Sequence, residues 1–466
     1  MKKGLIASYV AGIRDHTYGE SYATIFRFFL PEFVTALLLY SVPMWLEGYF
    51  ISHLKSTPTY ATLGATNNLI HFLIKMAEAF SVGTLVICGQ QNGKSDYKEV
   101  GKAARDAFWV TCVLGFIISS MLYFGAFWIY SWFGVPNEII QLGIPFLRLR
   151  AISFFFMFIY LAVVGFLRGI KNTKVPMQIF IMGTLILLAL EYLLIFGNYG
   201  FPEMGLQGSA LSAVIQYAFM ATASVIYMLY YPENRKYMVD LISVFKEPAY
   251  VRDILRLSWP VLLDKTTLAA AYLWLLKMIA PMGTAILATF SVVKDMERFA
   301  LAPAVAFAQV ITLLVSNDYG KHQWDAIKTN IKKTVFIASI FVMGILVLFA
   351  IKPEFIIGLF DKKGEFVHLA ARAFPILSIL AFFDLLQVVL SGALRGAANV
   401  KTVMYTRLMI VFGVFAPISY MLTYLPMEDQ LLKFIIIYGS FYVSNGIMSV
   451  IYINRFRTDV WKKNTV

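Results

Sequence analysis

Long apolar runs follow one another along almost the whole chain. They occupy residues 26–50, 60–90, 106–130, 138–165, 176–196, 206–231, 254–280, 283–316, 334–351, 366–393, 403–425 and 431–454. A helix needs about 20 mostly apolar residues to cross a bilayer, so each run predicts one spanning helix. Runs such as 179–190 lack the alternation that strands of a membrane barrel require. We therefore expect an all-α integral membrane protein with twelve transmembrane helices.

The composition supports the bilayer as the solvent of this chain. Apolar residues make up 59% of the sequence and charged residues 14%, against roughly 45–50% and 25% in an ordinary soluble domain. The net charge of +13 could suggest a nucleic-acid partner, but the basic residues are spread along the loops and do not form one patch. We expect the lipid bilayer, and no nucleic acid, as a partner.

The two halves of the sequence resemble each other. GFLRGIKNTKVPM (165–177) in the first half matches GALRGAANVKTVM (392–404) in the second, and Leu30-Pro31 has its counterpart in Trp259-Pro260 at nearly the same offset. Such an internal repeat of six helices gives both halves the same orientation in the membrane. It predicts two pseudo-symmetric six-helix lobes that face each other across a central cavity.

Polar segments divide the chain further. The longest polar stretch between apolar runs, 230–252, lies at the midpoint. Residues 1–13 have a basic start and an apolar run but no small-residue cleavage site, which indicates an interfacial helix and not a signal peptide. The expected parts are an N-terminal interfacial segment (1–20), an N-lobe (21–231), a cytoplasmic linker (232–252), a C-lobe (253–455) and a cytoplasmic tail (456–466).

The distribution of Lys and Arg predicts the orientation. If the N-terminus and every even-numbered loop are cytoplasmic, that side collects 25 basic residues, against 4 in the opposite loops. Cytoplasmic loops are enriched in Lys and Arg. We therefore expect a multi-pass protein of the plasma membrane, the inner membrane of a bacterium, with both termini in the cytoplasm.

Cofactor chemistry finds little support in the sequence. Cys88 and Cys112 lie in or beside apolar runs, where cysteine behaves as a small hydrophobe, and they cannot form a disulfide framework or a zinc site. The five histidines show no metal-ligand spacing, and no phosphate-binding loop is present. We expect no metal and no cofactor.

Several motifs together resemble a known family. They are the paired GxLRG segments after the fourth and tenth runs, the prolines near the start of the first and seventh, and the basic loops that begin at Gly93 and Gly320. With the duplicated twelve-helix layout, the sequence is similar from about residue 24 to 455 to the multidrug and toxic compound extrusion (MATE) family. That family belongs to a superfamily shared with lipid-linked oligosaccharide flippases.

The resemblance implies roles for particular acidic residues. FFDLLQVVLSGALRG (382–396) is similar to the tenth helix of the NorM-type branch, and on that match Asp384 couples transport to a cation. Glu47, sixteen residues after Pro31, is nearest to an acidic position of the family's first helix. The branch also has a Glu two turns after the proline of its seventh helix. This chain has Thr267 there and Asp264 closer to the proline.

Charged residues within the apolar runs are the other candidates. A charge facing lipid costs at least about 2.5–3.5 kcal/mol, so such groups point into the bundle or a watery cavity. A carboxyl group in apolar surroundings, such as Asp384 between Phe382-Phe383 and Leu385-Leu386, can take up and release a proton near neutral pH. The predicted ion-coupling residues are Asp384, Glu47, Asp264 and Asp295. The predicted cavity residues are Lys75, Glu78, Lys265, Lys277, Lys294, Arg298 and Gln387.

Structural roles compete with these assignments. Arg148, Arg150, Glu191 and Glu32 are expected in internal ion pairs or near helix ends, and Lys75 and Glu78, three residues apart, can pair with each other. Lys294, Asp295, Glu297 and Arg298 cover more than one helix face. Some of them must meet Asp264, Lys265 or Asp384, or line the cavity. Arg168 and Arg395 are expected at cytoplasmic helix ends, and Gly169 and Gly396 to permit the turns that follow, so these four form structural hinges.

The expected function is export of an organic, amphipathic solute by alternating access, driven by H⁺ or Na⁺ as the coupling ion. An alternative is a flippase for a lipid-linked sugar or other anionic amphiphile, which the intramembrane lysines favour. A third possibility, an intramembrane acyl or glycosyl transferase, lacks any recognisable paired motif at an interface. We expect a monomer that acts on a small-molecule or lipid-like substrate and is not an enzyme.

Overall fold

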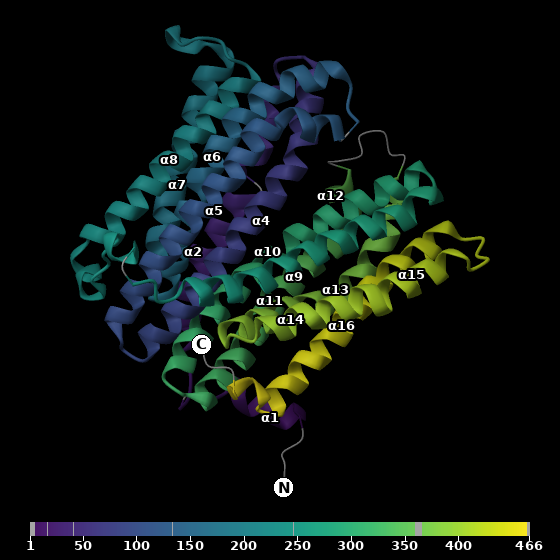
Figure 1. The fold of residues 1–466 in the computed structure, drawn as a ribbon. Helices are drawn as coiled ribbons and strands as arrows, with labels where there is room; N and C mark the ends of the chain where they lie inside the picture. The colour runs from purple at the N-terminus through teal and green to yellow at the C-terminus, as the bar shows by residue number, and fades with distance from the viewer. Residues whose placement is uncertain are drawn as a thin grey trace. The chain divides into compact units, whose positions relative to one another are not determined.

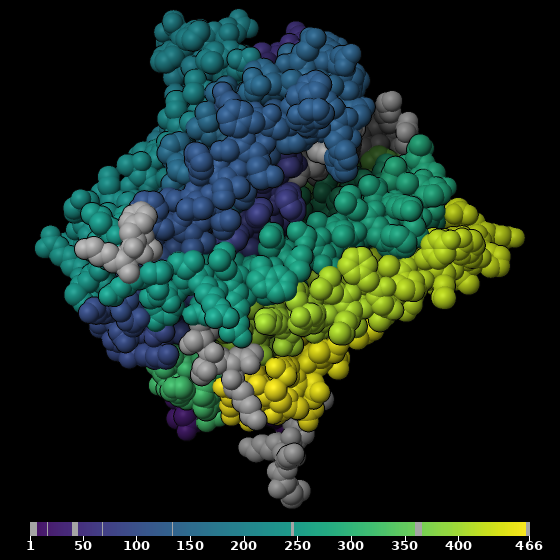
Figure 2. All heavy atoms as spheres, viewed as in Figure 1, coloured from purple at the N-terminus to yellow at the C-terminus, as the bar shows by residue number. Residues whose placement is uncertain are grey.

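The computed structural model describes residues 5–15, 17–40, 42–132, 134–245, 247–358 and 366–463, and the remaining residues are grey in Figure 2. The ends of two predicted parts, residues 1–4 of the interfacial segment and 464–466 of the tail, lie outside these ranges. The regular structure of the described residues is helical throughout (Figure 1). The long helices are α2 (Tyr22–Tyr40), α3 (Val42–Ser52), α4 (Thr57–Gly93), α5 (Tyr97–Trp132), α6 (Asn137–Gly169), α7 (Lys174–Phe196), α8 (Leu206–Tyr230), α9 (Val251–Ile279), α10 (Thr284–Gly320), α11 (Trp324–Ile351), α13 (Val367–Gly396), α14 (Val400–Ile410), α15 (Ala416–Thr423) and α16 (Gln430–Arg457).

Each of the twelve apolar runs coincides with one helix or a closely spaced pair. The first run forms α2 and α3, and the eleventh forms α14 and α15, joined by a π-helical turn at Val411–Phe415. By length and composition, eleven of the described helices can cross a membrane. The twelfth, α9, has 29 residues but is less apolar, because Asp264 and Lys265 lie in its middle. The all-α membrane fold predicted from the sequence is confirmed.

Packing divides the chain into two compact units. We call residues 30–259 the N-terminal unit and residues 1–29 with 260–466 the C-terminal unit. The boundaries between the units fall within α2 and α9, and the contacts of these two helices explain why. The first turns of α2 belong to the C-terminal unit, where the ring of Phe29 stacks on that of Phe307 with centroids 4.0 Å apart. The first turns of α9 belong to the N-terminal unit, where Ser258 is fully buried.

The repeated GxLRG segments form close helix contacts in both units. A methyl group built on Gly165 would lie 2.4 Å from the carbonyl oxygen of Ser81 on α4, and one on Gly392 would lie 2.5 Å from that of Ala308 on α10. Ser81 and Ala308 are separated in the sequence by the same offset as the two glycines. Small residues let the backbones of membrane helices approach this closely. The sequence repeat is therefore also a repeat of helix packing.

The backbone turns repeat in the same way, but they correct one prediction. Residues with positive φ after the GxLRG helices are Lys171 (φ 62°) and Ala398 (φ 57°), which occupy equivalent positions in the two halves. Gly169 and Gly396 are the last residues of α6 and α13, and neither has positive φ. The prediction that these glycines form the turns is wrong. Methyl groups on them would lie 2.7 Å from Cβ of Cys88 and 2.6 Å from the carbonyl oxygen of Thr312, so they serve close packing.

Both ends of the described chain dock at the start of α11 in the C-terminal unit. The expected N-terminal helix is α1 (Leu5–Ile13), and Lys332 donates to the carbonyl oxygen of Ser8 at 2.8 Å. At the other end, Lys328 pairs with Asp459 at 2.9 Å. The first and last described segments of the chain therefore contact the same end of α11.

The linker between the halves is fastened to the N-terminal unit. Asp106, fully buried near the start of α5, accepts the amide protons of Ala249 and Tyr250 at 2.7 and 2.6 Å. The indole of Trp109 donates to the carbonyl oxygen of Leu241 at 2.6 Å. A carboxylate at these amides caps the beginning of α9. The linker is therefore held against α5 by hydrogen bonds.

Candidate functional site

Asp384 lies in the middle of α13 and is buried, as its apolar neighbours predict. Its Oδ1 accepts a hydrogen bond from Nδ2 of Asn445 on α16 at 3.0 Å. The charge of Arg407 on α14 also acts on it, but Asp384 makes no ion pair within the described part of the chain. A buried carboxylate with an amide partner and no directly bound cation is free to take up a proton or another small cation.

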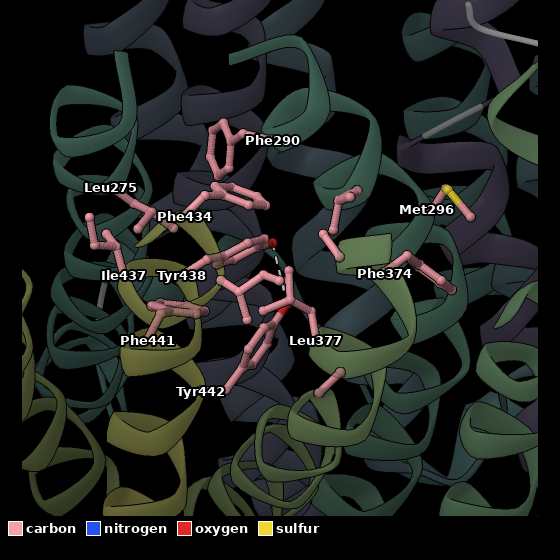
Figure 3. Close-up of a cluster of buried hydrophobic side chains, with 14 of the residues drawn as sticks. Leu275, Phe290, Met296, Phe374, Leu377, Phe434, Ile437, Tyr438, Phe441 and Tyr442 are labelled. Carbon is pink, nitrogen blue, oxygen red and sulfur yellow. Dashed lines mark hydrogen bonds between the residues drawn. The ribbon is translucent and has the colours of Figure 1, made fainter. Parts of the chain in front are cut away.

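A second buried carboxylate of the C-terminal unit is Glu297 on α10. Its Oε2 accepts hydrogen bonds from the hydroxyl groups of Tyr438, at 2.6 Å, and Tyr442. The two tyrosines lie one turn apart on α16, and their hydroxyl groups are also hydrogen-bonded to each other (Figure 3). Phe290, Phe434 and Phe441 surround them in an apolar cluster of the C-terminal unit, which excludes water from this carboxylate.

Asp264 is neutralised more directly than either of these carboxylates. It is fully buried on α9, and both of its oxygens are bound, Oδ2 by Arg395 of α13 and Oδ1 by Arg407 of α14. The predicted contact of Asp264 with the charges of α10 is therefore not its main interaction. Two guanidinium groups on one carboxylate leave no negative charge for a further cation. Asp264 thus acts as a structural anchor for the arginine of the second GxLRG segment.

The first GxLRG arginine is anchored in the same manner. Arg168 at the end of α6 donates from Nε and Nη2 to the two oxygens of Glu32 on α2, at 2.8 and 2.6 Å. Both side chains are buried. Glu32 follows Pro31 directly, whereas Asp264 lies four residues after Pro260. In each half an arginine of the fourth helix therefore forms an ion pair with an acidic residue near the proline of the first helix. The expected ion pair of Glu32 is confirmed.

Glu47 belongs to a separate buried cluster in the N-terminal unit. It lies on α3 and forms an ion pair with Arg150 of α6 and a hydrogen bond with the hydroxyl group of Ser209 on α8. Ser209 is also 3.4 Å from Oε1 of Glu191 on α7. Glu191 is fully buried, and its Oε2 has no hydrogen-bond partner among the described residues. The hydroxyl group of Ser209 thus lies between two buried carboxylates, of which Glu47 forms the ion pair with Arg150.

The other predicted residues differ in their exposure. Asp295, Arg298 and Lys277 are exposed, and the ammonium group of Lys294 lies over the ring of Phe290, 5.4 Å from its centroid. The remaining predicted cavity residues are buried or half-buried: Lys75, Glu78, Lys265 and Gln387. A surface hollow in the N-terminal unit is lined by Leu69, Trp128, Ile129, Ser131 and Trp132, and none of the predicted cavity residues lines it.

Sequence reasoning missed the polar stripe on α16. Tyr438, Tyr442, Asn445, Ser449 and Tyr452 recur at helical spacing along one face of an otherwise apolar helix, and all are buried. This periodicity is visible in the sequence and marks a face turned to partners inside the bundle. The partners of this face are not visible in the sequence. Glu297 lies 141 residues from Tyr438, and Asp384 lies 61 residues from Asn445.

His, Cys, Asp and Glu side chains are the usual protein ligands of metal ions. Within the described ranges, no group of three or more His, Cys, Asp and Glu side chains is placed to hold a metal ion. Cys88 is buried and Cys112 half-buried, and both are free thiols.

Comparison with known proteins identifies the family. The MatE family model matches residues 31–193 and 260–421, two segments that begin at the two prolines of the repeat and cover its two halves. The chain belongs to the MatE family. Members of this family are membrane transporters and not enzymes.

Curated relatives of this MatE chain are similar along most of their length. The probable multidrug resistance protein YoeA of Bacillus subtilis (strain 168) is 22% identical over 447 residues, 94% of each chain. The probable multidrug resistance protein NorM of Thermotoga maritima is 20% identical over 376 residues, 80% of each chain.

Solved structures share the fold at low identity. A MATE protein in the straight conformation has a TM-score of 0.85 and 16% identity, and the match covers 98% of this chain and 99% of that one. A transporter of the MOP superfamily from Pyrococcus furiosus has a TM-score of 0.84 and 16% identity, with the same coverage. This MatE chain therefore has the twelve-helix, two-lobe transporter fold.

Proposed function

We propose that this MatE transporter is a secondary active exporter of organic, amphipathic solutes that is driven by an inward flow of H⁺ or Na⁺. Relatives such as YoeA and NorM are described as multidrug resistance proteins, which supports a solute of that class. The observation that carries the proposal is the state of Asp384. It is buried in mid-helix, bonded to an amide, and makes no ion pair among the described residues.

The coupling follows from the free energy of a buried charge. An ionised Asp384 is costly in an apolar interior, and a bound proton or sodium ion removes most of that cost. The cation therefore stabilises the conformation in which Asp384 is enclosed, and its release favours one in which water reaches the group. A ligand that binds one state better shifts the populations of both, so cation entry and solute exit alternate. Glu47, with Arg150 and Glu191, provides a second place in the chain where such a shift can be linked to ionisation.

The distribution of the basic residues supports an orientation of this exporter in the membrane. We propose that it resides in the inner membrane with both termini in the cytoplasm, because the loops on that side hold most of the Lys and Arg. Every ion pair and hydrogen bond of the buried carboxylates described above joins residues of a single chain, and we propose that the exporter acts as a monomer.

Asp384→Asn tests the proposal. In sealed proteoliposomes with separate proton and sodium gradients, we expect the variant to lose gradient-driven efflux of cationic dyes and to retain dye binding in detergent. The matched control is Asp325→Asn, at an exposed position on α11, which should transport like the unaltered protein. Unchanged gradient-driven efflux by Asp384→Asn would refute the proposal.

The same vesicles separate export from lipid flipping. An exporter moves cationic dyes out of the vesicles under a proton or sodium gradient, whereas a flippase would retain a pyrophosphate-linked lipid and move no dye. The names of the curated relatives favour the first outcome. Retention of the lipid with no dye movement would replace export by flipping.

A further inference from the structure

One side of α5 binds the linker between the two halves. The α5 residues that make these contacts are spaced four apart: Gly101, Arg105 and Trp109. A methyl group built on Gly101 would lie 1.8 Å from the carbonyl oxygen of Tyr237. The guanidinium group of Arg105 donates to Oγ of Ser243 at 2.7 Å, and the indole of Trp109 donates to the carbonyl oxygen of Leu241 at 2.6 Å. Residues four apart lie on one side of a helix, so the linker runs lengthwise along α5.

Beyond Trp109 the same side of α5 is apolar and exposed. Val113 and Phe116, four and seven residues after Trp109, have exposed fractions of 54% and 66%. Because α5 is long and apolar enough to cross a membrane, these side chains contact lipid. Tryptophan is enriched where the hydrocarbon core of a bilayer meets the headgroups. The linker therefore covers this side of α5 up to the membrane boundary, and lipid covers it from there on.

Leu241 and Ile242, which we call the linker tip, lie closest to that boundary. The linker contacts Gly101 first and then Trp109, and these two residues are about 12 Å apart along α5 at a rise of 1.5 Å per residue. It then returns to Arg105 through residue 243. The side chain of Ile242 is 76% exposed, and contact with lipid removes that apolar area from water.

Two backbone polar groups of the linker tip have partners within the protein. The carbonyl oxygen of Leu241 accepts from Trp109, and the amide of Ile242 donates to Oδ1 of Asp240 at 3.0 Å. Contact with an apolar medium requires such pairing, because no water is present there to replace a missing partner. Asp240 itself is exposed, and an ionised carboxylate is costly in hydrocarbon. The tip can therefore enter the headgroup region but not the hydrocarbon core.

We propose that the linker tip is a membrane-inserted loop, in which Ile242 enters the headgroup–acyl boundary of the adjacent leaflet and the indole of Trp109 holds it there. Its partner is the apolar part of a phospholipid. The charged groups beside the tip, Asp240 and Arg105, have opposite signs, so the contact requires no anionic lipid. The linker that the sequence predicts as cytoplasmic thus also contacts the bilayer. This contact does not depend on the solute or on the coupling ion.

The experiment measures the depth of the tip in vesicles of uncharged phosphatidylcholine. Ile242→Cys is made in the full-length chain with Cys88→Ala and Cys112→Ala, and the single thiol is labelled with bimane. The matched control is Lys98→Cys, exposed in the first turn of α5 and roughly 16 Å before Trp109 along the helix. Two quenchers are compared, a phosphatidylcholine with a nitroxide on carbon 5 of its acyl chain and aqueous iodide.

We expect the two quenchers to rank the labels in opposite orders. An interfacial segment lies about 5–10 Å deep in the headgroup–acyl boundary, so the nitroxide lipid should quench the label at residue 242 at least about twofold more than the label at residue 98. Iodide should quench the label at residue 98 more. Circular dichroism verifies that each labelled protein folds.

A further variant, Trp109→Phe, tests the hydrogen bond that holds the tip. It keeps an aromatic ring and removes the donor to Leu241. We therefore expect lipid quenching of the label at residue 242 to fall toward that of the label at residue 98. If Trp109→Phe folds and leaves this quenching unchanged, the role assigned to Trp109 is refuted.

The vesicles contain no other protein, so quenching separates lipid from a protein partner. If iodide reaches the label at residue 242 as readily as the label at residue 98, and the nitroxide lipid does not quench it more, the tip lies in water. Membrane insertion is then refuted, and a surface for a soluble protein would replace it.

Discussion

Replacement of Gly165 by Ala tests whether the GxLRG segment is a packing motif. The new methyl group would lie 2.4 Å from the carbonyl oxygen of Ser81 and 2.9 Å from Cβ of Thr84, whereas ordinary contacts begin at 3.4 Å. The obstructing oxygen belongs to the backbone of α4, so α4 and α6 must separate by about 1 Å. Overpacking of this kind costs about 1–3 kcal/mol. For a unit of this size, a loss of about 2 kcal/mol lowers Tm by about 4–8 °C.

The assay is thermal unfolding in detergent, followed by the fluorescence of a thiol-reactive dye or by loss of the monodisperse peak. Gly64→Ala is the matched control, because this exposed glycine lies within α4 and has open space around it. That change should be neutral or stabilise by up to about 1 kcal/mol, since Ala restricts the unfolded chain.

The repeat provides a second check. Gly392→Ala meets the carbonyl oxygen of Ala308 at 2.5 Å and should destabilise the C-terminal unit by a similar amount. Because the two sites lie in different units, the losses in the double variant should add. If Gly165→Ala unfolds at the same temperature as Gly64→Ala, the close-packing argument is wrong.

Two further predictions concern charged groups. Asp264→Asn leaves Arg395 and Arg407 buried without their carboxylate and should cost about 3–5 kcal/mol, measured by thermal unfolding; a loss no greater than that of the exposed Asp325→Asn would contradict the pairing. The ammonium groups of Lys328 and Lys462 hold the pKa of Asp459 below its usual range. At pH values above the unfolded-state pKa of about 4, these ion pairs therefore stabilise the docked C-terminal segment. That contribution disappears as the pH falls through the lowered value, and hydrogen exchange of residues 456–463 should rise there in the unaltered protein more than in Asp459→Asn.

The fold was largely predictable because the bilayer leaves few solutions for an apolar chain. Each apolar run became a helix or a pair of helices, and the offset between the two halves of the sequence reappears in the contacts of Gly165 and Gly392 and in the turns at Lys171 and Ala398. Both results rest on local patterns, which a sequence displays directly.

The pairings inside the bundle were not predictable in the same way. The burial of Asp384 follows from its neighbours in sequence, but the two arginines on Asp264 lie 131 and 143 residues away. Their choice depends on which faces of α9, α13 and α14 meet. The role of the glycines was misassigned for a related reason, because the backbone of α4 or α10 that they contact is distant in sequence. Tertiary contacts of this kind need coordinates.

The division of α2 and α9 has a consequence for how the two units are joined. The chain passes between them twice, at residues 29/30 and 259/260, and each passage lies within a helix beside a proline, Pro31 or Pro260. Since the 232–252 segment is bound to α5, a rotation of one body against the other has to be absorbed by bending at these two joints. Cutting the backbone in that segment would produce two fragments. The first would carry residues 1–29, which belong to the C-terminal unit, and the second would carry the first turns of α9, which belong to the N-terminal unit. Because each fragment contains part of the other's unit, the two fragments should re-associate.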